Sequence, residues 1–160
     1  MTEDREAKRE AKSEADGKKL CLTSPADIRK IMERYGFAFS KSLGQNFLID
    51  THAVDKIVDA VRREIKKSPD SEGASAASKC LVIEIGPGFG VLTERLCDVA
   101  EHVIAIEKDK TLPPILREIV PAGNLDIICE DVLKCDLDTL IRDAGYETAV
   151  VVANLPYYIT

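Results

Sequence analysis

The sequence predicts an α/β fold: a Rossmann-like, doubly wound parallel sheet with helices on its faces. Three observations predict it. Short apolar runs rich in β-branched residues alternate with segments whose apolar residues have helical spacing. A glycine-rich turn at residues 86–90 directly follows one of these runs, and carboxylates stand at or just after the ends of two later runs. Strands that alternate with helices form parallel sheets through right-handed crossovers, and ligands bind where the strands end.

Length and composition are those of a single globular unit. The chain has 160 residues, of which 45% are hydrophobic and 31% are charged, and its net charge is −6. A negative total is compatible with a nucleic-acid partner, because a local basic face can bind phosphate. The first residues are charged, and no apolar run approaches the ~20 residues that span a bilayer. We therefore expect no secretory signal, no membrane partner and a cytoplasmic location.

The five cysteines form no C-x-x-C pair. Cys80 and Cys129 fall in strand-like runs, and Cys97 falls on a helix face. These positions predict buried, reduced thiols in a cytosolic protein. The same spacing supports no zinc site, and we predict no metal.

The chain begins with a charged tail, and a helix start follows it. Residues 1–22 are mostly Glu, Asp, Lys, Arg and Ala, which predicts a solvated, disordered tail. Ser24 is then the expected helix N-cap, with Pro25 at the first helical position. The Asp27 side chain is expected to accept a hydrogen bond from the backbone N–H of the cap. Gly36 is the expected end of this helix.

The segment that follows, residues 37–50, has no clean period. Gln45 and Asn46 lie among apolar side chains that include Leu48. Physical reasoning alone favours an ordinary connector over polar groups held for a ligand. A second helix is expected from Asp50 or Thr51. Basic residues crowd its last turns, where the helix dipole explains them better than RNA binding does. Residues 68–78 read as a flexible loop.

The glycine turn is the strongest local signal. Residues 81–85 read as a strand buried on both faces, and a helical pattern follows residue 90. The dinucleotide fingerprint needs a glycine where this chain has Val91. With Glu84 placed two residues before Gly86, the turn instead resembles motif I of S-adenosylmethionine-dependent methyltransferases. A purely structural strand–turn–helix corner is the alternative.

Carboxylates end the next two predicted strands. Residues 103–107 end in Glu107, which is 107 − 88 = 19 residues after Gly88. A carboxylate about 20 residues after the glycines is placed to bind ribose hydroxyls. A helix is expected at residues 112–119 and a third strand at 124–129, after which Asp131 could accept a hydrogen bond from an adenine amino group. Solvated acids at strand ends are the alternative.

The last predicted strand, residues 149–153, follows a short helix at 138–143 and delivers Asn154-Leu155-Pro156-Tyr157. This set suits the methylation of an exocyclic amine, whose lone pair is delocalised into its ring. The Asn154 side-chain oxygen and the Leu155 carbonyl can accept its hydrogen bonds. Pro156 rigidifies the turn, and Tyr157 offers a stacking face for a flipped base. A simple strand-ending turn is the alternative.

Taken together, these motifs resemble the ribosomal RNA adenine N6,N6-dimethyltransferase family, in particular its bacterial small-subunit members. The resemblance covers about residues 24–160 and rests on the motifs at 42–50, 82–90, 103–109, 130–133 and 153–160. It implies S-adenosyl-L-methionine as cofactor and two neighbouring adenines near the 3′ end of small-subunit rRNA as substrate, methylated during ribosome assembly. The implied cofactor-binding residues are Gln45, Asn46, Leu48, Gly86, Gly88, Glu107, Asp131 and Asn154. The implied catalytic residues are Asn154, Leu155, Pro156 and Tyr157.

The resemblance also implies how the chain is organised. Residues 1–22 would be the tail, 23–78 a helical and cofactor-covering segment, and 79–160 the first half of the methyltransferase domain. The family continues with further strands and a helical RNA-engaging domain, so this chain resembles the N-terminal portion only. We expect the strand at 149–153 to lie at an open sheet edge, with weak stability and little or no methylation by this chain alone.

Three other functions stay open on the sequence. One is a large-subunit rRNA adenine methylase that confers antibiotic resistance. Another is a non-catalytic module that binds RNA or cofactor without turnover. A nicotinamide-dependent oxidoreductase is the third, and Val91 in the place of the third fingerprint glycine disfavours it.

Overall fold

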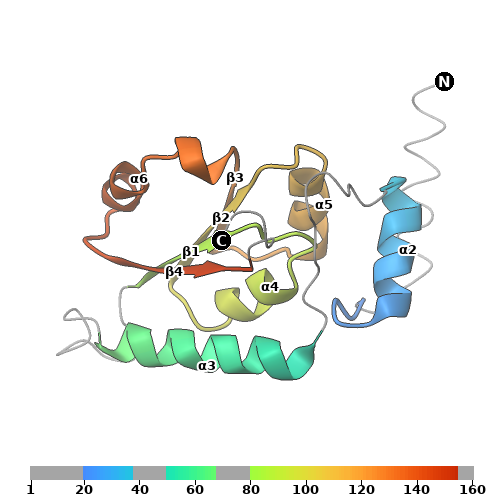
Figure 1. Ribbon diagram of the computed structural model, residues 1–160, viewed down its shortest axis with the longest axis horizontal. Helices are drawn as coiled ribbons and strands as arrows, with labels where there is room; N and C mark the ends of the chain where they lie inside the picture. Colours follow the sequence, from blue (N-terminus) through green and yellow to red (C-terminus); the bar gives the residue numbers. More distant parts are fainter. Residues whose placement is uncertain (1–19, 38–49, 68–79, 155–160) are drawn as a thin grey trace.

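The computed structural model describes residues 20–37, 50–67 and 80–154. Within them strands alternate with helices, so the predicted α/β class is confirmed (Figure 1). The predicted tail and the loop at 68–78 lie almost wholly outside the described residues. The elements in chain order are α2 (Pro25–Tyr35), α3 (Thr51–Lys67), β1 (Leu81–Ile85), α4 (Val91–Cys97), β2 (His102–Glu107), α5 (Leu112–Ile119), β3 (Leu125–Cys129), the 3-10 turn η3 (Val132–Lys134), α6 (Leu137–Asp143) and β4 (Ala149–Ala153).

The four strands form one parallel sheet in the order β3-β2-β1-β4. Ile85 at the end of β1 aligns with Ile106 on one side and with Ala153 on the other. Glu107 at the end of β2 aligns with Cys129 at the end of β3. All four carboxyl ends therefore meet at one edge of the sheet. Among the described residues β4 is an outer strand, as the sequence predicted.

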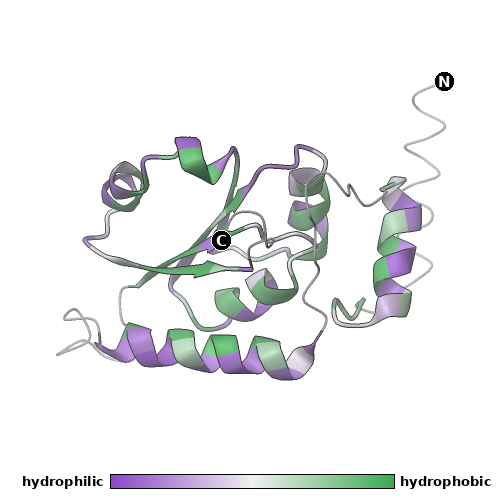
Figure 2. Ribbon diagram, in the orientation of Figure 1, coloured by the Kyte–Doolittle hydropathy of each residue, from purple (hydrophilic) through white to green (hydrophobic). Residues whose placement is uncertain are grey.

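Helices cover both faces of the sheet, which makes it doubly wound (Figure 1). The main hydrophobic core lies under α3, α4 and α5, and it also takes in the apolar face of α2. In Figure 2 the strands are mostly hydrophobic, whereas α3 alternates between hydrophobic and hydrophilic residues. The apolar stripe of α3 packs inward and its charged residues face solvent.

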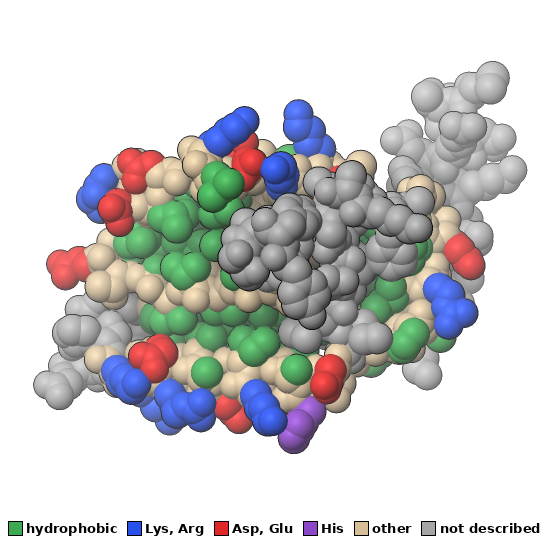
Figure 3. Space-filling view, viewed as in Figure 1, with side chains coloured by type: hydrophobic (Ala, Val, Ile, Leu, Met, Phe, Trp, Pro, Cys, Tyr) green, Lys and Arg blue, Asp and Glu red, His purple; other side chains and the backbone are tan. Residues whose placement is uncertain are grey.

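The opposite face is covered more thinly, by η3 and α6. Beneath them β1 and β2 bury four large side chains, but the apolar side chains of α6 are themselves only half-buried. Leu133 on η3 is 79% exposed and Val151 on β4 is 50% exposed. Figure 3 shows hydrophobic side chains gathered on this side of the molecule. Parallel sheets are ordinarily buried on both faces, so this apolar surface is unusual.

The first described helix, α2, begins much as the sequence predicts. The Ser24 side chain accepts a hydrogen bond from the Asp27 backbone N–H at 3.4 Å, and Gly36 ends the helix with a φ of 61°. The Asp27 carboxylate differs from the prediction, because it accepts from the Cys21 N–H at 3.1 Å instead of from the cap. The Ser24 N–H already donates to the Cys21 carbonyl at 2.9 Å, so the cap has no N–H left to offer.

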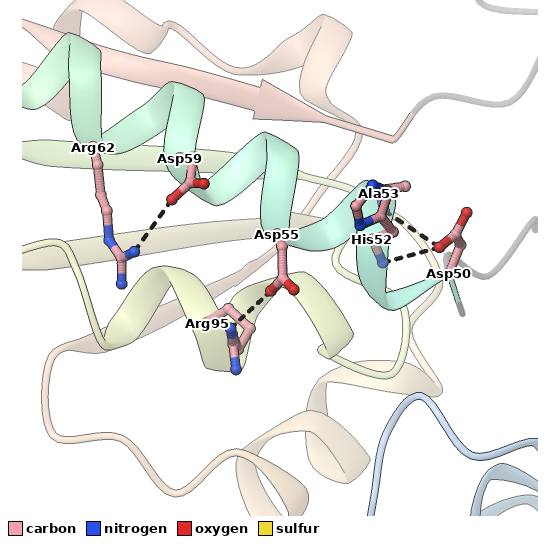
Figure 4. Close-up of polar contacts among 7 residues, drawn as sticks. All are labelled: Asp50, His52, Ala53, Asp55, Asp59, Arg62 and Arg95. Carbon is pink, nitrogen blue, oxygen red and sulfur yellow. Dashed lines mark hydrogen bonds and ion pairs between the residues drawn. The ribbon is translucent and has the colours of Figure 1, made fainter.

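Helix α3 is capped by Asp50, one of the two residues predicted for this role. Its Oδ1 accepts hydrogen bonds from the backbone N–H groups of His52 at 2.9 Å and Ala53 at 3.4 Å (Figure 4). An ion pair of 2.8 Å between Asp55 and Arg95 then joins α3 to α4. The buried stripe of α3 holds the helix on the sheet, and the exposed ion pair adds a contact with α4.

All five cysteines are free thiols, but they are not all buried. Cys80 is buried and Cys97 is half-buried, whereas Cys21 and Cys129 are exposed. The prediction of burial is therefore wrong for Cys129, because β3 is an outer strand and Cys129 is its last residue. In the described part of the chain, no helix combines the length and the hydrophobicity that crossing a bilayer would take.

Candidate functional site

The carboxyl edge of the sheet collects the predicted site residues that the structure describes. Gly86 follows β1, Glu107 ends β2, Asp131 lies two residues beyond β3, and Asn154 directly follows β4. Gly86 and Asn154 are 154 − 86 = 68 residues apart in the chain. Parallel pairing brings them to the same edge because β1 and β4 are neighbours in register.

The glycine turn has a backbone that other residues adopt with strain. Gly86, Gly88 and Gly90 have φ values of 70°, 59° and 80°. A Cβ built on Gly86 would meet nothing within 4 Å, so the backbone there faces open space. Phe89 is fully buried beneath the turn, and its ring meets that of Phe37 edge-on at a centroid distance of 5.1 Å. The turn is thus anchored from below and open on one side.

Gly90 is needed for the packing of α5 against the turn and does not face a ligand. A Cβ on it would lie 2.4 Å from Leu116 Cδ1 and 2.7 Å from Val120 Cγ2, so only glycine lets α5 approach this closely. Val91, which stands where the dinucleotide fingerprint has its third glycine, is buried at the first position of α4. Gly86, whose backbone faces open space, is therefore the glycine of this turn best placed for a ligand.

Glu107 joins the ends of β1 and β2. Its Oε2 accepts a hydrogen bond from the Gly88 N–H at 3.2 Å, and its Oε1 accepts one from the Asp109 N–H at 2.8 Å. Burial raises the pKa of this carboxyl, and the backbone N–H groups of Asp109, Gly88 and Lys108 oppose the rise. A carboxylate offers about four acceptor positions, so acceptor capacity remains for a ligand such as a ribose diol.

Asp131 is held at the same edge by two contacts. Its Oδ1 accepts from the Leu133 N–H at 3.1 Å, which caps η3, and its Oδ2 pairs with Lys108 Nζ at 2.9 Å. The Lys108 ammonium holds the pKa of the Asp131 carboxyl below its usual range. Sequence reasoning missed Lys108. The sequence offered one indication: Lys108 directly follows β2, and the acidic Asp131 follows β3, the strand that pairs with β2.

Glu84 is a buried carboxyl behind the glycine turn. Its side chain enters the core on the α4 face, and burial raises its pKa to about 7. The nearby Thr93 hydroxyl opposes this rise. Yet among the described residues neither Glu84 Oε2 nor Thr93 Oγ1 has a hydrogen-bond partner of good geometry. The sequence used Glu84 only as a marker of the motif, and no pattern pointed to Thr93.

The remaining predicted site residues are Gln45, Asn46 and Leu48 and, beyond Asn154, Leu155, Pro156 and Tyr157. They lie outside the described residues, so their roles stay predictions. Asn154 itself is exposed at the end of β4. In the described ranges, no group of three or more His, Cys, Asp or Glu side chains is arranged to hold a metal ion.

Comparison with known proteins decides the family. A family model described as ribosomal RNA adenine dimethylase matches residues 36–160. The chain belongs to this family. The Geobacillus sp. (strain WCH70) protein named ribosomal RNA small subunit methyltransferase A is 47% identical over 142 residues, which are 87% of this chain and 44% of that protein. A protein of the same name from Alkaliphilus oremlandii is 45% identical over 141 residues, 87% of this chain and 45% of that protein.

Solved structures agree with this assignment. A dimethyladenosine transferase from Plasmodium falciparum is 25% identical with a TM-score of 0.50, covering 69% of this chain and 34% of that one. The Pyrococcus horikoshii protein PH1948 is 17% identical with a TM-score of 0.54, covering 81% and 58% of the two chains, and shows the shared fold. The family resemblance read from the motifs is thus confirmed. This chain spans less than half the length of the named methyltransferase A relatives.

Proposed function

We propose that the chain carries the cofactor-binding half of an S-adenosyl-L-methionine-dependent enzyme that dimethylates N6 of adenines in small-subunit rRNA. The observation that carries this proposal is Glu107, which is bonded to Gly88 across the carboxyl edge and retains acceptor capacity. Family membership and the relatives' name support it. The enzyme would act on the assembling small ribosomal subunit in the cytoplasm.

The residues of this edge fit the cofactor. When bound, S-adenosyl-L-methionine supplies a methyl group activated on a sulfonium. Glu107 would accept hydrogen bonds from the two ribose hydroxyls, and the open backbone at Gly86 would let the ligand approach closely. Asp131 would accept a hydrogen bond from the adenine amino group. Gln45, Asn46 and Leu48 would complete the cofactor contacts, as the family resemblance implies.

The target amine would be held at the end of β4. The Asn154 side-chain oxygen and the Leu155 carbonyl would accept hydrogen bonds from its two N–H groups, which would favour a tetrahedral nitrogen whose lone pair is no longer delocalised into the ring. Pro156 would rigidify this turn, and Tyr157 would stack on the flipped adenine. Such a transfer depends chiefly on positioning. The implied target is a pair of neighbouring adenines near the 3′ end of the rRNA.

A module that binds RNA or cofactor without turnover is the second candidate. It shares the described carboxyl edge with the first candidate and differs from it only in whether methyl transfer follows binding. We propose residues 79–160 as the first half of a methyltransferase domain, 23–78 as the segment that covers the cofactor, and 1–22 as a tail.

Calorimetric titration with S-adenosyl-L-methionine tests the cofactor assignment. Saturable binding is expected for the wild-type chain and for Glu147→Gln, which removes one exposed carboxylate away from the carboxyl edge. Glu107→Gln removes the charged acceptor with little change in shape and is expected to bind at least tenfold more weakly, a loss of ~1.4 kcal/mol or more. Equal affinities for Glu107→Gln and Glu147→Gln would reject the assignment.

Methyl transfer then separates the two candidates. Purified small subunits lacking the modification are incubated with the chain and cofactor carrying a labelled methyl group. Label in the rRNA that disappears with Asn154→Ala would support an enzyme. Cofactor binding without label would support the binding module.

A further inference from the structure

The ends of β2 and β3 are bridged by an ion pair between Lys108 and Asp131. Lys108 directly follows Glu107, and its Nζ lies 2.9 Å from Oδ2 of Asp131. The side chains of Lys108 and Asp131 are 62% and 20% exposed. The bridge therefore lies at the solvent side of the carboxyl edge, next to the carboxylate proposed to bind ribose.

The two oxygens of Asp131 have different neighbours. Oδ1 accepts from the Leu133 N–H at 3.1 Å and so belongs to the cap of η3. Oδ2 is the oxygen that Lys108 contacts. The hydrogen bond from the Leu133 N–H to Oδ1 does not involve Lys108, so the Asp131 carboxylate keeps this anchor when Lys108 leaves. Lys108 covers the other oxygen, Oδ2.

We propose that Lys108 sets the cofactor affinity of this chain by occupying the Asp131 oxygen that the adenine amino group must reach. The proposal rests on the proposed function, in which Asp131 receives that amino group. Lys108 is then a competitor within the site: its ammonium leaves Oδ2, or shares it, when an adenosine ligand binds. The Lys108 side chain is exposed, so its ammonium can be hydrated when it leaves Oδ2.

The size and sign of the effect follow from the chemistry of the pair. An ammonium is a charged donor, whereas the adenine amino group is a neutral and weaker one. Exposed ion pairs are weak, so the competition is expected to lower affinity about two- to fivefold. Salt screens the ion pair but barely affects a neutral amine. Affinity for an uncharged adenosine ligand should therefore rise with ionic strength in the wild-type chain.

The test uses S-adenosylhomocysteine, which carries no net charge at neutral pH, in calorimetric titrations at low and high salt. Lys108→Met keeps the length of the side chain and removes its charge. Lys110→Met makes the same change on an exposed lysine two residues away, which has no ion pair among the residues the structure describes. Lys108→Met is expected to bind about two- to fivefold more tightly at low salt and to lose the salt-dependent gain. Lys110→Met should match the wild type in both respects.

A ligand-free measurement separates this inference from the cofactor assignment. NMR titration of the Asp131 carboxyl carbon should show a higher pKa in Lys108→Met and no change in Lys110→Met, because the ammonium lowers that pKa. If the pKa moves but the affinities of the two variants agree, or if Lys108→Met binds more weakly, the competition is refuted. No binding by the wild-type chain would reject the cofactor assignment together with this inference.

Discussion

Replacing Glu84 by glutamine is expected to remove the stability loss that this carboxyl causes as the pH rises from 4.5 to 7. Burial raises the pKa of this carboxyl from 4.5 to about 7. In this pH range the folded state keeps the proton that the unfolded state has released. Stability from this group is therefore fully present below 4.5 and is lost as the pH rises through 7.

The magnitude follows from the two pKa values. Their difference is about 7 − 4.5 = 2.5, and each pKa unit corresponds to ~1.4 kcal/mol, so the loss is ~3 kcal/mol. The glutamine side chain in Glu84→Gln would have the shape of the protonated carboxyl and no proton to lose. The variant should therefore be about as stable as the wild type near pH 4.5 and more stable above pH 7.

Urea unfolding at a series of pH values provides the assay. For each protein, wild type and Glu84→Gln, the change in unfolding free energy with pH is measured, and the two changes are compared. This comparison matters because burial also raises the pKa of Glu107, and both proteins retain that contribution. Glu147→Gln, an exposed site, should leave the wild-type slope unchanged. Parallel curves for wild type and Glu84→Gln would refute the reasoning, since Glu84 would then ionise as readily in the folded state as in the unfolded chain.

Two further predictions concern the contacts that hold the two ends of α4 in place. Gly90→Ala should destabilise the chain by about 1–3 kcal/mol, because its Cβ would approach side chains of the α5 region to 2.4 and 2.7 Å at a φ of +80°. Gly123→Ala, where a Cβ would meet nothing within 4 Å, is the control in the same urea assay, and equal stabilities would contradict this argument. Asn124→Ala should cost about 1–3 kcal/mol, because the Asn124 amide donates to the carbonyls of Cys97 and Ala100 at 3.0 Å each. An Asn124→Ala variant as stable as wild type would show that water replaces both bonds.

Much of this site could be predicted because a residue that follows a parallel strand must lie at the carboxyl edge of the sheet. Once the runs at 81–85 and 103–107 are read as parallel strands, Gly86 and Glu107 must lie at one edge, and the structure places them there. The same reasoning brings Asp131 and Asn154 to that edge without knowledge of the strand order. Periodicity and turn chemistry are local properties, and they were sufficient for this part.

Pairings between distant side chains could not be predicted in this way. The Lys108 and Asp131 contact depends on which loops face each other, and the cap that Asn124 provides for α4 depends on packing 24 to 27 residues away. The burial of Cys129 was misjudged for a related reason. A strand-like run does not reveal whether its strand will be central or outer, and β3 is outer.

The strand order also has a consequence for how the site is assembled in time. Pairing of β1 with β2 joins residues 102 − 81 = 21 apart, whereas pairing of β1 with β4 joins residues 149 − 81 = 68 apart. Closing the longer loop costs ~1 kcal/mol more in chain entropy, and contacts distant in sequence slow folding. We therefore expect the three strands β1, β2 and β3 to form a nucleus that already carries the glycine turn and Glu107. Strand β4 would add later, so the cofactor side of the site would exist before Asn154 arrives to complete the side that holds the target amine.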